Sequence, residues 1–413
     1  MAAGAFLLLV LFAAAMYNSN VEKKCQINTL KTAPLLVTTI GSKTLLSGYS
    51  GLIERNKSEK IEFYCSTGFM FKNDGINQFF SDYTTETLSC QPDGSFLFNN
   101  HEGLRIDGDK KSVECINGVA AMFESRTSLP NCKEHTSFVL GHDFQEMGSI
   151  KSAALCYNIA GAQLKYIVYT TYPTKSRALE LSQEGQLNEL GFDINVNASD
   201  RFFKTASQAD VDAFWGKEKQ LTQMFGTGPF DYASLVQDEA LVVHLAGYED
   251  MMSIVWLHNL RTGNWRHWLA ALRSASESGD QFDIRLGVSG LIEMPESPDS
   301  CDLAIDLADG SVLPVPAHIW AHVQALQPTG RPEDEFVLVG HNSPFFRGGT
   351  SADFCPSMCD QVSWLRNTLF ARLHRYPING LMLCCRVEDV AQKLDSFYGS
   401  RSGVQATATT TEK

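Results

Sequence analysis

The sequence predicts an α+β fold with a small β-rich module at its N-terminus. Strand-like and helix-like patterns follow one another without the regular alternation that produces a doubly wound sheet. Five of the eleven cysteines fall between Cys25 and Cys132, among short strand-like runs. The chain has 413 residues, which is enough for one large domain and a smaller one.

The N-terminus predicts secretion. Residues 5–16 are apolar and the chain then turns polar, a run too short to span a bilayer and typical of a signal peptide. We therefore expect a signal peptide at residues 1–19 and an extracellular protein without a membrane partner; the alternative is a buried N-terminal helix. In an oxidising compartment most cysteines should pair, and the odd count leaves at least one over.

Residues 20–135 are predicted to form a disulfide-stapled β-rich module. The runs Lys60–Cys65 and Thr87–Cys90 alternate like strands and lie between Asn, Asp and Gly turns. Near the other end of the chain, a second cysteine group is open to two interpretations. Zinc ligation by four thiolates is one, but the spacing and the expected secretion favour disulfides. That group consists of Cys355, Cys359, Cys384 and Cys385.

Residues 136–400 are predicted to form the larger domain, followed by a disordered Thr- and Ala-rich tail at 401–413. Its strands are β-branched, aromatic or strictly alternating runs, and its helices carry apolar residues on one face. The expected strands are Leu164–Tyr172, Phe282–Val288 and Glu335–Val339. The expected helices are Gln208–Phe225, a segment with Trp265, Trp268, Leu269 and Leu272, a segment with Trp320, Val323 and Leu326, and Cys359–Leu373.

Charge is distributed unevenly along the chain. The net charge is −13, which as an average argues against nucleic-acid binding, yet a local patch can still set the field over a cleft. No carboxylate occurs between Met251 and Glu277, a stretch that holds Arg261, Arg266, His267 and Arg273. A second basic run contains Arg366, Arg372, His374 and Arg375. Each run is either a phosphate-binding surface or the solvated face of an amphipathic helix. The spacing of Trp265 and Trp268 favours the core.

From about residue 150 to 395, seven segments occur in an order that resembles the secreted insect branch of the DNA/RNA non-specific endonucleases. That family has a ββα-metal (His-Me) core, and within it the chain is most similar to the Tsal-type salivary nuclease-like proteins of blood-feeding flies, which bind nucleic acids. The segments are Tyr166–Tyr172, Val243–Ala246, Thr262–Trp265, Leu313–Trp320, His341–Pro344, Cys359–Trp364 and Cys384–Cys385.

The resemblance implies a degenerate catalytic site. His244 stands at the family's general-base position, but Val242 replaces the arginine two residues before it. The family's metal-binding asparagine is Arg261 here, and its glutamate is Leu269. A guanidinium offers no oxygen ligand to Mg²⁺, so we expect no metal bound in the family manner. A shift in register would leave Asn259 or Asn264 as the ligand.

The sequence therefore favours a secreted, sequence-independent binder of the DNA and RNA phosphate backbone, with weak or no hydrolysis and no cofactor. The residues expected at the interface are Arg261, Arg266, His267, Arg366 and Arg372. One alternative is an active Mg²⁺-dependent endonuclease with rearranged ligands. Another is a secreted protein-binding scaffold whose N-terminal module makes the contacts.

Overall fold

The computed structural model describes residues 23–399 except 30–33, 41–42, 49–50, 66, 108–109, 117–119, 144–148, 172–177, 181–185, 197–205, 218–227, 246, 295–301, 308–309 and 346–353. The predicted signal peptide, the predicted tail and the second half of the predicted helix 208–225 lie outside these ranges. The chain divides into two compact units, residues 1–119 and 120–413. The division falls before the boundary expected at 135, because Ala121–Glu124 (β12) pairs with a strand of the larger unit.

The N-terminal unit consists of strands in two sheets, and two disulfides join these sheets. Cys25–Cys90 and Cys65–Cys115 link them. The expected strands at Lys60–Tyr64 and Thr85–Cys90 are present. One sheet has the order β4 (Gly51–Arg55), β1 (Cys25–Thr29), β11 (Lys111–Cys115), β6 (Phe69–Asn73), β7 (Ile76–Ser81). The other contains β10 (Arg105–Ile106), β9 (Phe96–Phe98), β8 (Thr85–Cys90), β5 (Lys60–Tyr64), β2 (Leu35–Ile40) and β3 (Lys43–Gly48).

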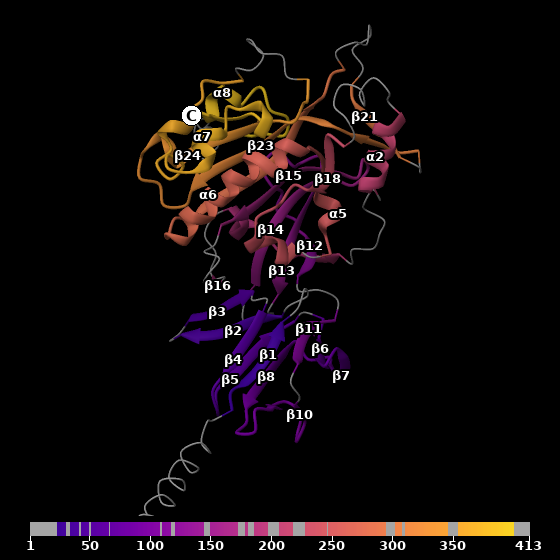
Figure 1. The fold of residues 1–413 in the computed structure, drawn as a ribbon, viewed down its shortest axis with the longest axis vertical. Helices are drawn as coiled ribbons and strands as arrows, with labels where there is room; N and C mark the ends of the chain where they lie inside the picture. Colours follow the sequence, from indigo (N-terminus) through magenta and orange to yellow (C-terminus); the bar gives the residue numbers. More distant parts are fainter. Residues whose placement is uncertain are drawn as a thin grey trace, which may run out of the picture. The chain divides into compact units, whose positions relative to one another are not determined.

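The larger unit is built on one antiparallel sheet with nine strands among the described residues, and helices pack against it (Figure 1). This confirms the α+β class. The strand order is β17 (Ile194–Val196), β12, β13 (Thr136–Asp143), β14 (Ser149–Asn158), β15 (Gln163–Thr170), β20 (Phe282–Leu291), β23 (Pro316–Ala325), β24 (Glu335–His341), β25 (Met382–Cys385).

Both faces of this sheet are buried. Along β23, Ile319, Ala321 and Val323 join a core with helix α6 (Arg266–Glu277), whereas Trp320 joins a second core on the opposite face. That second core includes Val390 of α8 (Val387–Val390). The segment with Trp320 and Val323 is therefore a strand, and the predicted helix there is wrong. The i, i+3 spacing arose because a strand buried on both faces is apolar at nearly every position.

The larger unit contains further short elements besides the strands of the nine-stranded sheet. The predicted helix 359–373 is present only as a short 3₁₀ turn and a five-residue helix, which begins after Thr368 caps it through Ala371 N–H. Besides α8, these short elements of the larger unit are, in chain order, β16 (Ala178–Glu180), η3 (Gln186–Glu189), α2 (Gln208–Lys217), β18 (Phe230–Ser234), α4 (Glu239–Val242), η5 (Val243–Leu245), α5 (Glu249–Met252), β19 (Ser253–Leu257), η6 (Leu260–Trp265), β21 (Ala304–Asp306), β22 (Val312–Pro314), η7 (Pro332–Asp334), η9 (Cys359–Gln361), α7 (Leu369–Leu373) and η10 (Pro377–Asn379).

The C-terminal cysteines form disulfides, Cys355–Cys385 and Cys359–Cys384, which excludes the zinc alternative for these four thiols. Adjacent residues of a strand point to opposite faces, so the two bonds tie residues 355–359 to both faces of β25. Met358 N–H also donates to Cys384 O at 2.8 Å. Cys132–Cys156 is the fifth disulfide; Cys301 lies outside the described residues. No described helix is long and apolar enough to cross a bilayer.

Candidate nucleic-acid interface

Helix α6 is anchored by Trp265 and Trp268, which the spacing of the sequence predicted to lie in the core. Trp265 and Trp268 are fully buried, and the rings of Trp256, Trp265 and Trp268 pack edge to face, with centroids 5.1 and 5.0 Å apart. This fixes the rotation of the helix about its axis. Arg266 consequently lies exposed at its start, while His267 is half-buried.

The turn before α6 is a π-helical segment, η6, that is tied to the segment after α7. Asn264 is fully buried, and its Nδ2 donates to Leu373 O at 2.8 Å and Gly380 O at 2.5 Å. Gly263 is required here, since a Cβ at this position would lie 2.4 Å from Asn379 O. The two basic segments of the sequence are therefore neighbours, and α6 contacts α7 directly (Figure 1).

The second basic segment presents its arginines to solvent. Arg366, Arg372 and Arg375 are exposed. Arg366 donates to the backbone carbonyls of Asp360 and Gln361, and Arg375 lies 3.9 Å from the Asp360 carboxylate. Within the part of the chain that the structure describes, Arg266 and Arg372 have no ion-pair partner. The structure thus brings Arg266 and His267 next to the segment that carries Arg366 and Arg372.

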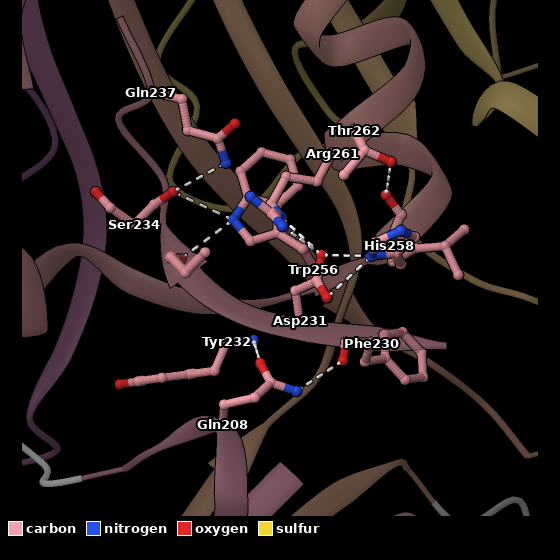
Figure 2. A network of polar contacts seen from close by, with 12 residues as sticks. Gln208, Phe230, Asp231, Tyr232, Ser234, Gln237, Trp256, His258, Arg261 and Thr262 are labelled. Atoms are coloured by element: carbon pink, nitrogen blue, oxygen red, sulfur yellow. Dashed lines mark hydrogen bonds and ion pairs between the residues drawn. The ribbon is translucent and has the colours of Figure 1, made fainter. Parts of the chain in front are cut away.

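Arg261 lies in a polar cluster with Asp231 and His258, shown in Figure 2. Its Nε and Nη2 each lie 2.7 Å from Asp231 Oδ2. His258 Nδ1 lies 3.0 and 2.9 Å from the two carboxylate oxygens. The Arg261 and Asp231 side chains are 29% and 18% exposed, so solvent reaches the pair. The sequence analysis predicted a cation without a neighbouring negative charge here, whereas the structure shows that the Asp231 carboxylate balances the Arg261 guanidinium.

Strand pairing positions Asp231 for this contact. Asp231 lies on β18 opposite Trp256 of β19, and Arg261 follows β19 by one turn. Trp256 Nε1 donates to the carbonyls of Ala233 and Ser234, which holds the hairpin closed (Figure 2). No local sequence pattern indicates Asp231, because this carboxylate lies 30 residues from its partner Arg261.

His244 has different surroundings. It lies in η5 between the two hairpin strands, is 5% exposed, and its ring is 6.3 Å from that of His142 on β13. Burial, followed by the neighbouring His244, holds the pKa of His142 well below its ordinary value. His244 packs against His142, whereas Arg261 binds Asp231. The two positions that the family resemblance combined in one site therefore make separate contacts.

The residues around Arg261 do not fit the magnesium ion that a ββα-metal core implies. Mg²⁺ needs oxygen ligands and retains several waters. The Asp231 oxygens already hold Arg261 and His258. Asn264 Oδ1 is sealed from solvent and has no hydrogen-bond partner among the described residues, so a hydrated ion cannot reach it. Asn259 is exposed and offers one amide oxygen.

Comparison with known proteins adds a distant structural similarity. No family model matches the chain, and no curated protein matches it. Among solved structures, the chain is similar to a chain in the crystal structure of the EndoG/EndoGI complex, which concerns the mechanism of EndoG inhibition. The match has a TM-score of 0.27 and 10% identity, and covers 57% of this chain and 87% of the other. A TM-score of this size does not establish a common fold.

Proposed function

We propose that this protein is a secreted, sequence-independent binder of DNA and RNA with a nuclease-like core and weak or no hydrolysis. The observation that carries the proposal is the junction between the start of α6 and the segment after α7. There the buried Asn264 side chain holds the two basic segments together. Exposed arginines from both segments then form one positive surface.

The local charge balance supports phosphate binding. Residues 252–276 contain three arginines and no acid, and residues 354–381 contain three arginines and only Asp360. Arg273 is paired with Glu239, at 3.1 Å, which leaves Arg266 and Arg372 as the main candidates for phosphate contacts. Such contacts supply most of the sequence-independent affinity for nucleic acid.

The order of elements supports a ββα core as part of the proposal. The antiparallel strands β18 and β19 are followed directly by η6 and α6, and His244 lies in the connection between the strands. Hydrolysis at such a core needs a base and a metal near the scissile phosphate. With Arg261 paired to Asp231, and His244 packed against His142, we expect a rate several orders of magnitude below that of an active nuclease.

A binding titration at several salt concentrations, with and without EDTA, tests the proposal. We expect affinity for a random-sequence duplex to fall steeply with salt and to persist in EDTA. Arg266→Ala and Arg372→Ala should each reduce the slope of log K against log salt by about one, for all sequences alike. Arg386→Ala is the matched control, since this exposed arginine directly precedes α8, which packs on the other face of the sheet.

Two results contradict the proposal and point to its alternatives. Loss of binding in EDTA shows that a metal is needed, and cleavage of a plasmid in Mg²⁺, absent in His244→Ala, identifies an active endonuclease. Absence of any affinity at low salt favours a protein-binding scaffold, because fold alone does not fix function.

A further inference from the structure

A cavity of about 300 Å³ adjoins the Arg261–Asp231–His258 cluster. Three prolines, Pro229, Pro344 and Pro377, contribute to its apolar walls, and His258, Asn259 and Ser343 contribute polar groups. Because His258 also binds Asp231, the cavity and the cluster share a side chain. Small-molecule sites range from about 300 to 1,000 Å³, so this cavity suits a group about the size of one ring system rather than a large ligand.

The lining of the cavity is uncharged apart from histidine. Among its described lining residues there is no carboxylate, lysine or arginine. Asn259 is exposed, and its amide presents a donor and an acceptor side by side. The edge of a nucleobase presents the same combination. A cavity of this size, with apolar walls and such an amide in its lining, is suited to a base.

One wall of the cavity belongs to an exposed apolar segment that follows two arginines. Pro377 lines the cavity, and next to it Tyr376 is 57% exposed; Ile378 is 76% exposed. Arg372 and Arg375 precede them and are exposed. The Tyr376 ring makes no ring contact or side-chain hydrogen bond with the residues that the structure describes. Proteins that bind single-stranded nucleic acids combine exposed aromatic rings, on which bases stack, with nearby cations that contact the phosphates.

We propose that the preferred ligand is single-stranded nucleic acid, with one base in this cavity and a neighbouring base stacked on Tyr376. The inference rests on the proposed function and adds the strand state of the ligand. A paired base has neither a free face nor a free pairing edge, and a base pair is too large for the cavity. Arg266, Arg372 and Arg375 then contact the phosphates on either side.

The test compares three fluorescent probes of about 12 nucleotides, within the usual site size for single strands. They are a DNA strand, the same strand with every base removed, and the duplex. The first two carry the same phosphates, so their difference reports contacts to bases alone. We expect the intact strand to bind about tenfold more tightly than the other two, the effect of one or two base contacts.

Variants assign that difference to residues. Tyr376→Ala and Asn259→Ala should bring the intact strand close to the abasic strand and leave abasic binding unchanged. Arg372→Ala should weaken all three probes by a similar factor. Tyr83→Ala is the control for Tyr376, because Tyr83 is 55% exposed and belongs to the N-terminal unit; it should change nothing.

Results other than those expected distinguish failure of the single-strand inference from failure of the proposed nucleic-acid binding. Equal affinity for the three probes overturns the single-strand inference and leaves phosphate binding standing. A Tyr376→Ala variant that loses abasic binding equally shows a structural role for the ring, which also overturns the inference. If no probe binds at low salt, the proposed function itself fails.

Discussion

Asp231 partly neutralises the positive charge of Arg261 and so weakens its attraction for an anionic ligand. The resemblance predicted a cation at Arg261 in place of a metal ligand. It did not predict the carboxylate that balances it, because strand pairing brings Asp231 there from the other side of a hairpin. A phosphate that approaches Arg261 therefore also approaches a like charge.

Asp231→Asn should tighten phosphate binding about fivefold at low salt. The change keeps a hydrogen-bond acceptor for Arg261 and removes one negative charge, an effect of about 1 kcal/mol at a solvent-exposed distance of a few ångströms. The gain should fade as salt is added. Titration of a duplex measures it, with Asp389→Asn on α8 as the control. Unchanged affinity at low salt shows that the ligand does not come near Arg261.

Asn264→Ala should destabilise the protein by about 3 kcal/mol. The change leaves two inward-facing carbonyls, those of Leu373 and Gly380, without their donor, and each unsatisfied buried group costs about 1–3 kcal/mol. Urea unfolding in EDTA measures the loss. The exposed Asn259→Ala is the control and should change stability by less than about 0.5 kcal/mol. A loss that appears only with Mg²⁺ present indicates a ligand instead.

At the scale of elements, periodicity predicted β20 and α6 and failed on β23, although residues 282–287 of β20 are buried as well. The alternating Phe282–Val288 and the apolar face of α6 were confirmed. β23 was mistaken for a helix because both of its faces are covered, which removes the alternation that identifies a strand. The helix predicted at 359–373 is an α-helix only at Leu369–Leu373 (α7), because the Cys359–Cys384 bond holds the first residues of this segment against β25.

Replacing Cys359 and Cys384 with serine should lower the free energy of unfolding by about 3 kcal/mol, the value for a loop of 25 residues. It should also weaken nucleic-acid binding, because the bond anchors the segment that leads into α7. The Cys132–Cys156 bond closes a loop of 24 residues, and its double serine variant should lose similar stability without weaker binding. Thermal unfolding and a duplex titration give the two readouts. Equal weakening in both variants contradicts a specific role for the first bond.

For the whole molecule, composition predicted two parts and a disulfide-rich chain, and residue patterns could not fix where the parts divide. β12 is short and precedes Cys132, so it looks like a continuation of the N-terminal module. Only its pairing with β13 and β17 assigns it to the large sheet. Non-local pairing of this kind has no signature within the paired strand.

The large unit should lose stability as the pH falls from about 6.5 to 4. Burial lowers the pKa of His341 to about 4, and burial together with the neighbouring His341 lowers the pKa of His318 to about 4. The unfolded chain has a histidine pKa near 6.5. In this window the unfolded state therefore binds more protons, and each ring costs about 1.4 kcal/mol per pH unit. His318 and His341 pair across β23 and β24.

Urea unfolding at pH 7, 6 and 5 measures this dependence. The double variant His318→Gln, His341→Gln should show a shallower decline than the unmodified protein, whatever its stability at pH 7. His267→Gln, half-buried on α6, is the control and should leave the decline unchanged. A double variant with an unaltered slope rules out these two rings as its source.

The disulfide-linked segment 355–359 has a consequence for association between copies of the chain. β25 ends the sheet, and a terminal strand with unpaired backbone groups is a template on which a foreign strand can add. Met358 N–H donates to one such group, Cys384 O, and the two disulfides hold residues 355–359 against both faces of β25. Oxidation therefore keeps the sheet from growing by strand addition at this end, and a reducing environment removes that protection.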